Sequence, residues 1–304
     1  VDAGSIVDAT YGFVEGSDAL SIITPLSDTG AAEVRVSLNA QQFSPAGSIA
    51  FHGTPSIKLV SPSTGPARGS TPLRSELSYE LHTLPLRGQA NCFLCRFDAD
   101  GIPADGGVSL SPPLDAPAHR NPSAANELLC LPPPQMPLGS YGIEVSLNAQ
   151  EFSVSKLAFS VYGETAVNLL CPSSGPARGG TSLRVFGTNL TAGSEYVCRF
   201  EDTAMNATHA PATNHPNELR CRTPARGHLP HVISFVGVEV SLNGHDFTES
   251  EALFTYYPEP WPIELCPSSG PMGGQTHVRI TGRHFAFGSD NRVLVSAWIA
   301  SSAN

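Results

Sequence analysis

The chain of 304 residues is poor in lysine, because Lys58 and Lys156 are its only two. Lysine and arginine together number 17 against 27 aspartates and glutamates, so the formal net charge is −10 at pH 7. A chain without a cluster of basic side chains cannot neutralise a run of phosphates. The composition therefore excludes nucleic acid as a partner.

A long apolar run is also missing. The best apolar stretch, residues 231–240, has the length of one strand and is broken by Gly237, whereas a membrane span needs about 18 or more apolar residues. No charged-then-apolar leader begins at Val1, so the compartment must be inferred from other features. We expect no direct membrane insertion in this segment.

Turn-forming residues are abundant instead. The chain has 28 glycines and 27 prolines, while charged residues make up 14%. This balance favours short strands joined by turns over long helices. The length suffices for two or three domains, and the expected fold class is all-β.

One hairpin pattern occurs three times, as EVRVSLNAQQF (33–43), EVSLNAQEF (144–152) and EVSLNGHDF (239–247). An alternating strand runs into Asn39, Asn148 or Asn243, and the chain returns through a phenylalanine. Asparagine tolerates the left-handed backbone of a tight turn, so we expect it to take that conformation here.

A second pattern opens each repeat, as SPSTGPARGST (61–71), CPSSGPARGGT (171–181) and CPSSGPMGGQT (266–276). Its glycines and prolines suit a corner where a strand crosses between sheets. The spacing, roughly 95 to 110 residues, fits an immunoglobulin-like sandwich. We expect a partial repeat over 1–53, complete repeats over 55–163 and 165–257, and a partial repeat over 262–304. The short linkers predict a stiff rod, and the partial repeats at both ends indicate that it is cut from a longer array.

Several motifs of the third repeat occur in a characteristic order: the Gly-Pro corner, CRF (198–200), CRTP (221–224), VSLNG (240–244) and FTYY (254–257). In this order they resemble the IPT/TIG family. The resemblance implies tandem immunoglobulin-like β-sandwiches. Members include plexin and growth-factor-receptor ectodomains, Rel-type transcription factors, accessory modules of carbohydrate enzymes, and large surface proteins of microbes and algae.

Four cysteines occupy matching places in the two complete repeats. Cys95 and Cys130 correspond to Cys198 and Cys221, and in the first repeat both places change together, to Tyr11 and Ile22. Joint loss is typical of a disulfide pair, so we predict Cys95–Cys130 and Cys198–Cys221 bridges and an oxidising compartment. The alternative is that these cysteines are small buried residues.

The other cysteines are Cys92, Cys171 and Cys266. Cys92 and Cys95 form a Cys-x-x-Cys, but strand residues three apart point to opposite faces, which suits neither zinc nor redox chemistry. Cys171 and Cys266 hold equivalent positions in successive repeats. We expect all three to be available for bonds between repeats or between chains.

Two N-glycosylation sequons occur, at Asn189 and Asn206, and both fall where exposed loops are expected. Covalent glycans and the disulfides both indicate an extracellular or cell-surface location. Asn121 is followed by proline and is not a sequon.

Catalytic, cofactor-binding and metal-ligating patterns are not found in the sequence. The pair His228 and His231 lies in a proline-rich loop, without the helical spacing of a shared metal site. The acidic stretch 98–105 lacks the ligand pattern of a calcium loop. We expect no enzyme activity, no cofactor and no metal.

Disulfide-locked rods suit two kinds of function. The first interpretation is an extracellular structural glycoprotein that assembles with itself or a neighbouring surface protein into a fibre, wall or flagellar-hair (mastigoneme-like) structure. The alternatives are the ligand-binding ectodomain of a plexin-like receptor and an accessory module of a carbohydrate-active enzyme.

Overall fold

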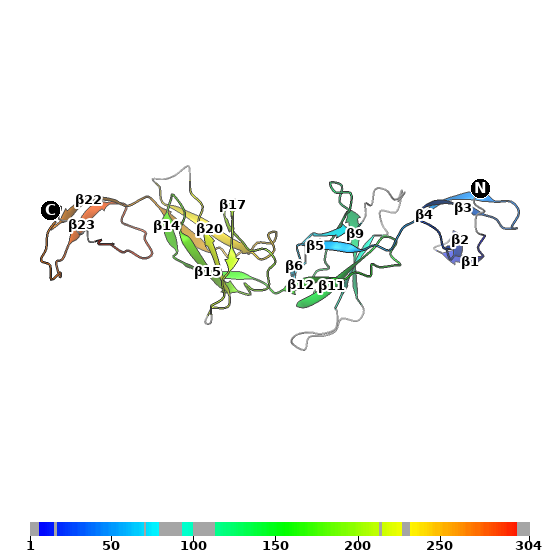
Figure 1. The fold of residues 1–304 in the computed structure, drawn as a ribbon, viewed down its shortest axis with the longest axis horizontal. Helices are drawn as coiled ribbons and strands as arrows, with labels where there is room; N and C mark the ends of the chain where they lie inside the picture. The colour runs from blue at the N-terminus through cyan, green and yellow to red at the C-terminus, as the bar shows by residue number, and fades with distance from the viewer. Residues whose placement is uncertain are drawn as a thin grey trace, which may run out of the picture.

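The computed structural model describes residues 6–14, 17–69, 71–78, 93–99, 113–212, 215–226 and 232–296. Throughout these ranges the regular structure is strand only, as the composition predicts. The strands form a row of β-structures along the long axis of the molecule (Figure 1), with the first repeat at one end and the fourth at the other. The fold is all-β and consists of tandem immunoglobulin-like sandwiches.

The second repeat contains strands β5 to β12. Its hydrogen-bonded order is β5-β7-β10-β9-β8-β11-β12-β6, because β9 pairs with β10 at one end and with β8 at the other. The strands are β5 (Ile57–Ser61), β6 (Thr64–Pro66), β7 (Leu73–Leu77), β8 (Leu94–Asp98), β9 (Leu114–Arg120), β10 (Glu127–Cys130), β11 (Gly139–Ser146) and β12 (Leu157–Tyr162).

The third repeat contains strands β13 to β21 in two sheets. The four-stranded sheet has the order β13-β15-β19-β18, and the five-stranded sheet has the order β14-β21-β20-β16-β17. The strands are β13 (Ala166–Cys171), β14 (Ser174–Pro176), β15 (Ser182–Thr188), β16 (Val197–Phe200), β17 (Thr203–Asn206), β18 (Thr208–His209), β19 (Glu218–Arg222), β20 (Ser234–Ser241) and β21 (Leu253–Tyr257).

Each complete repeat has its own apolar core. In β15, Leu183 and Val185 are fully buried while Arg184 between them points outward, which is the alternation that a sheet with one solvated face imposes. Phe200 and Phe254 meet edge to face within the core, as Phe97 and Phe159 do in the second repeat. Such aromatic pairs stabilise beyond the area that they bury.

The Gly-Pro corner requires its glycine because the chain passes close to other atoms there. A Cβ on Gly175 would lie 2.3 Å from the hydroxyl of Thr181 and 2.9 Å from the ring of Phe254. Short parallel strands follow from this approach, β14 against β21 and β6 against β12. The proline two residues before the Thr or Ser of each corner, at 62, 172 and 267, follows a cis peptide bond.

The hairpin turn differs from the expected one. The side-chain Oδ1 of Asn243 accepts the backbone N–H groups of His245 and Asp246 at 3.0 and 2.9 Å, so the asparagine caps the turn with its side chain. The prediction that asparagine itself takes the left-handed conformation is wrong. Positive φ falls on the next residue in all three copies: Ala40 (59°), Ala149 (61°) and Gly244 (75°).

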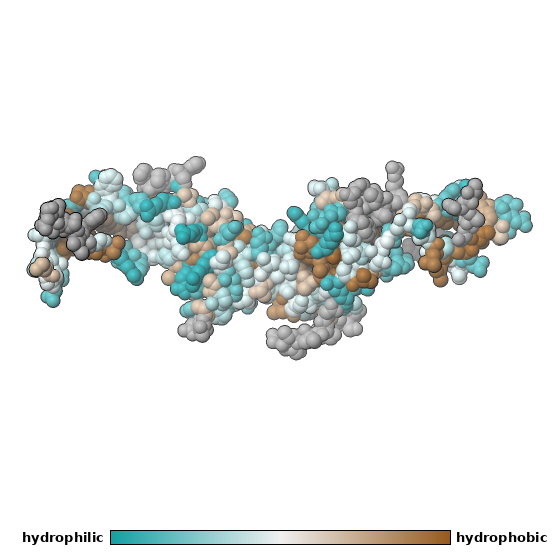
Figure 2. All heavy atoms as spheres, viewed as in Figure 1, coloured by the Kyte–Doolittle hydropathy of each residue, from teal (hydrophilic) through white to brown (hydrophobic). Residues whose placement is uncertain are grey.

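The first and fourth repeats contribute hairpins: β1 (Ala9–Val14) with β2 (Ser17–Ile22), β3 (Gly30–Val36) with β4 (Ser44–Phe51), and β22 (Trp261–Cys266) with β23 (Arg279–Arg283). The described apolar side chains of these hairpins are exposed or half-buried. Phe285 is 42% exposed, whereas its counterpart Leu190 in the third repeat is fully buried. In Figure 2, brown apolar side chains accordingly reach the surface at both ends of the molecule.

Candidate interaction and modification sites

Two disulfides cross the cores of the complete repeats. The structure pairs Cys95 of β8 with Cys130 of β10 at a Cα–Cα distance of 5.9 Å, and Cys198 of β16 with Cys221 of β19 at 6.6 Å. Both distances lie in the range that a disulfide spans. Each bridge links one sheet of its sandwich to the other. All four cysteines are buried.

The remaining cysteines have different surroundings. Cys171 ends β13 and Cys266 ends β22, and both are free and exposed. Cys92 lies outside the described residues, as do His228, His231 and most of the acidic stretch 98–105. The structure therefore provides two accessible thiols at equivalent places of neighbouring repeats.

The two sequons have unlike environments. Asn189 takes a left-handed backbone conformation, with φ of 53°, and its side-chain Nδ2 donates to the carbonyl oxygen of Glu164 at 2.8 Å. Glu164 lies in the link between the second and third repeats. The amide nitrogen that would carry a glycan at Asn189 is thus used to fix this link.

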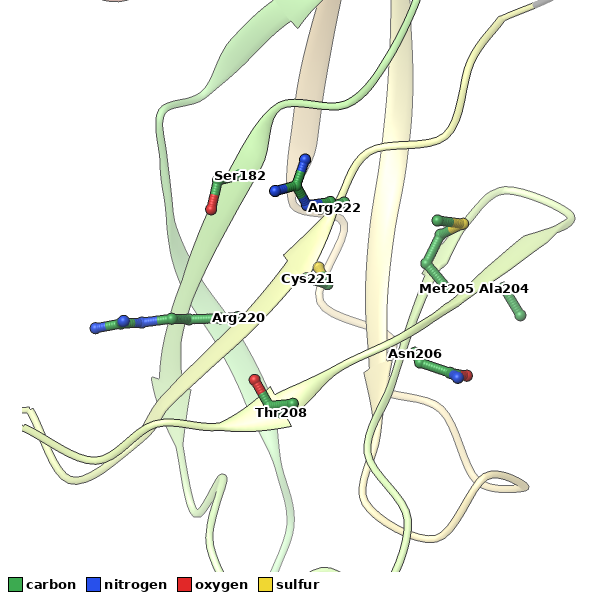
Figure 3. A pocket seen from close by; sticks show the side chains of 8 residues that line it. All are labelled: Ser182, Ala204, Met205, Asn206, Thr208, Arg220, Cys221 and Arg222. Carbon is green, nitrogen blue, oxygen red and sulfur yellow. The ribbon is translucent and has the colours of Figure 1, made fainter.

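Asn206 lies where the chain crosses between the two sheets. It ends β17, the last strand of the five-stranded sheet, and Thr208 of the same sequon begins β18, the last strand of the four-stranded sheet. Both side chains line a hollow of about 570 Å³, shown in Figure 3. Asn206 is exposed, and the hollow lies over the Cys221 end of the disulfide.

A charged cluster lies on the outer face of the four-stranded sheet. Glu218 accepts two hydrogen bonds from Arg184, at 2.9 and 2.8 Å, and one from Arg220 at 2.8 Å. These bonds, with Arg184 contributing most and Arg220 next, lower the pKa of Glu218 to about 2. The carboxylate therefore stays ionised and fully paired at neutral pH, which is a structural rather than a catalytic arrangement.

Apolar side chains are exposed on the outer face of the five-stranded sheet. Phe235 and Leu253 lie on adjacent strands of this face, and their side chains are 60% and 58% exposed. The equivalent residues of the second repeat are Ser140 and Ala158. A stacked pair, with the Arg199 guanidinium 4.0 Å from the centre of the Phe247 ring, lies on the same repeat. The exposed apolar pair Phe235 and Leu253 distinguishes the third repeat from the second.

Metal and membrane sites are not found in the described part of the chain. No group of three or more histidine, cysteine, aspartate or glutamate side chains is arranged there to hold a metal ion. Among the same residues there is no helix with the length and apolar character needed to cross a bilayer. The site residues of these ranges are cysteines, sequons and surface side chains.

The paired sheets, the core disulfide and the crossing strand define the class of an immunoglobulin-like sandwich. Residues 166–256 match the family described as IPT/TIG domain. The third repeat is therefore an IPT/TIG domain, as its motifs suggested.

Proteins with sequence similarity to this chain include ones that are much longer. Human fibrocystin-L is 29% identical over 154 residues, which are 50% of this chain and 3% of fibrocystin-L. Mouse plexin-B2 is 28% identical over 127 residues, which are 41% of this chain and 7% of plexin-B2. The chain thus spans less than a tenth of the length of these relatives. Among solved structures, the plexin A4 full extracellular region aligns with 75% of this chain and 18% of its own, at 20% identity and a TM-score of 0.42.

Proposed function

We propose that the chain is a non-enzymatic segment of a cell-surface ectodomain, in which rigid IPT/TIG sandwiches display surfaces to a protein partner outside the cell. The observation that carries this proposal is the IPT/TIG domain at 166–256, together with the sequence similarity to plexin-B2. The two core disulfides support an oxidising compartment. The plexin-like interpretation is better supported by the relatives than the fibre or mastigoneme-like assembly ranked first from the sequence.

Immunogold electron microscopy of the source cells, with antibodies against the 304-residue chain, separates the two interpretations. A receptor ectodomain gives dispersed labelling along the cell surface. Labelling confined to filaments, walls or flagellar hairs would instead support the structural assembly. Labelling only inside the cell would contradict both.

The partner surface that we propose is the exposed pair Phe235 and Leu253. Exposed apolar side chains with a polar rim are typical of protein-binding patches. The matched variant Phe235→Ser with Leu253→Ala carries the residues of the second repeat at these places, so its fold is retained. We expect the fluorescently labelled variant to bind source cells at least about tenfold more weakly than the native chain, since anchors of this kind each contribute more than about 1 kcal/mol. Equal binding would exclude this face.

We also propose that Asn206 carries an N-glycan and that Asn189 does not. A glycan on Asn206 covers the last strand of an open sheet edge, where unpaired backbone groups otherwise invite pairing with another chain. Asn189 has its amide nitrogen bound to Glu164. In the chain secreted from eukaryotic cells, Thr208→Ala should abolish the enzymatic deglycosylation mass shift and Thr191→Ala should leave it unchanged. The reverse result would refute the assignment.

A further inference from the structure

The end of the second repeat that carries the Gly-Pro corner contacts the third repeat through Thr64. The backbone N–H of Ser194 donates to Oγ1 of Thr64 at 3.2 Å, and the two hydroxyl oxygens are 3.0 Å apart. Thr64 is 7% exposed. The corner of one sandwich is therefore covered by the Gly193-Ser194 loop of the next.

The hairpin turn of the third repeat adds a second contact at the same place. Nδ2 of Asn243 donates to the carbonyl oxygen of Thr64 at 3.2 Å and to Asp246 at 2.8 Å, and Asp246 also accepts from the hydroxyl of Thr71. Asn243 is fully buried. Buried amides need their partners, because an unpaired one costs free energy. This turn fixes the joint in addition to the loop.

The contact at the hydroxyl recurs at the next joint. Ser174 holds the corner position that Thr64 holds one repeat earlier, and Ser289 follows Gly288 as Ser194 follows Gly193. The backbone N–H of Ser289 donates to Oγ of Ser174 at 2.8 Å. Ser174 is 6% exposed. The same pair of positions thus makes the same hydrogen bond across two successive joints.

Glycine has a steric role in the loop. A Cβ on Gly193 would lie 2.6 Å from the carbonyl oxygen of Leu242, and one on Gly288 would lie 2.2 Å from the side chain of Asn291. The small residue lets the loop fold tightly and present the next backbone N–H to the neighbouring corner. The acceptor is a side-chain hydroxyl, so the contact depends on Thr or Ser at the corner.

We propose that this hydroxyl and the Gly-Ser loop form a connector, defined as Thr64 with Ser194 and Ser174 with Ser289, which holds successive sandwiches in one fixed orientation. The interaction surface is the corner end of each sandwich, and its partner is the loop end of the following sandwich. The connector is independent of which ligand or glycan the repeats carry. It gives a physical basis for the stiff joints expected from the short linkers.

The natural thiols allow a direct test in the full chain, because Cys171 and Cys266 are exposed and lie on either side of the second joint. With Cys92→Ser as background, spin labels on these two cysteines should give one narrow distance distribution. Ser174→Ala, which removes the acceptor, should broaden or shift it. Ser174→Thr, which installs the residue of the preceding corner, should keep it narrow.

Cysteine pairs test both joints by replacing each hydrogen bond of the connector with a possible disulfide, whose formation reports that the two positions lie close together. In a chain with Cys92, Cys171 and Cys266 replaced by serine, Thr64→Cys with Ser194→Cys and Ser174→Cys with Ser289→Cys should form disulfides under mild oxidation, measured by peptide mass mapping. In the control variants the partners are exchanged, so that Thr64→Cys is combined with Ser289→Cys, and Ser174→Cys with Ser194→Cys. These pairs use the same four positions but combine residues that do not contact each other. They should react at least about tenfold more slowly, because their effective concentration is low. Equal rates, or a Ser174→Ala distribution with the same width and the same mean distance as that of the native chain, would overturn the connector.

Discussion

The second and third repeats share one sandwich but differ in the strand that crosses between its sheets. In the second repeat, β9 is continuous and pairs with both β8 and β10, which joins all strands into one hydrogen-bonded order. In the third repeat the crossing strand is interrupted at Ala207 into β17 and β18. The interruption leaves two sheet edges, a hollow and a sequon at one place. The cores of the two repeats are alike, but their sheet edges differ, and the edge of the third repeat carries the Asn206 sequon.

Removing a disulfide should lower the stability of its repeat more than the other substitutions proposed here. The cysteines are 35 residues apart in the second repeat and 23 in the third. Cys95→Ala with Cys130→Ala, and separately Cys198→Ala with Cys221→Ala, should each cost about 3–4 kcal/mol, with the longer loop costing about 0.4 kcal/mol more.

Hydrogen exchange read by mass spectrometry measures the stability of each repeat within the full chain. The bridge-free repeat should lose protection while the other repeat keeps it, which makes the untouched repeat the control. Loss of protection in both repeats together would show that they unfold as one unit and would weaken the comparison.

The corner glycines should have the next largest effect. Gly179 has φ of +76°, and a Cβ there would lie 2.5 Å from the backbone of Pro224, whereas the counterpart Gly69 has its nearest atom at 3.0 Å. We expect Gly179→Ala to cost about 2–4 kcal/mol, from the left-handed backbone and the overpacking together, and Gly69→Ala to cost less.

Gly180 separates the two causes. Its φ is +79° and no atom lies within 4 Å of an added Cβ, so Gly180→Ala should cost only the backbone term of about 1 kcal/mol. Urea unfolding followed by pulse proteolysis provides the measurement. If Gly179→Ala and Gly180→Ala cost the same, close packing against Pro224 is not the reason for the glycine.

The smallest expected difference between the two repeats is in the stability that each loses at acid pH. The pKa of Glu218 is about 2 in the folded chain against 4.5 for an unperturbed glutamate. Stability from this shift is fully present above pH 4.5 and is lost as the pH falls toward 2. The second repeat has Leu129 in place of Arg220, so it lacks this cluster.

Glu218→Gln should lower the stability of the third repeat at pH 7 and flatten its loss of stability between pH 4.5 and 2. Pulse proteolysis at a series of pH values gives the slope, and the second repeat in the same sample is the reference. An unchanged slope in the variant would mean that other carboxylates control the acid response.

The repeating motifs made much of the fold predictable. The alternating pattern before each asparagine indicated a strand, and the glycines and prolines of the second pattern indicated a corner where a strand crosses between sheets. The turn was predicted in the right place but with the left-handed residue one position early, because the side chain of Asn243 caps the turn instead of adopting that backbone. The bonds that decide this detail are local, because Asn243 accepts from the backbone N–H groups two and three residues further on.

The candidate sites were only partly predictable. The sequons at Asn189 and Asn206 look alike as triplets, yet only the structure shows that the first has its amide nitrogen bound to Glu164. The contact between Thr64 and Ser194 joins residues 130 positions apart. No local pattern marks such a pair, since hydroxyl residues are common at turns for other reasons.

The sequence by itself determined the all-β class, the repeat and the positions of the core cysteines, because these follow from periodicity and from comparing one repeat with the next. The tertiary structure alone decided how the crossing strand divides, which sequon is open and how the corner of one sandwich meets the loop of the following one. These features depend on the packing of segments that are distant in the chain. Their energies arise from contacts that form only when both sheets, and both neighbouring repeats, are in place.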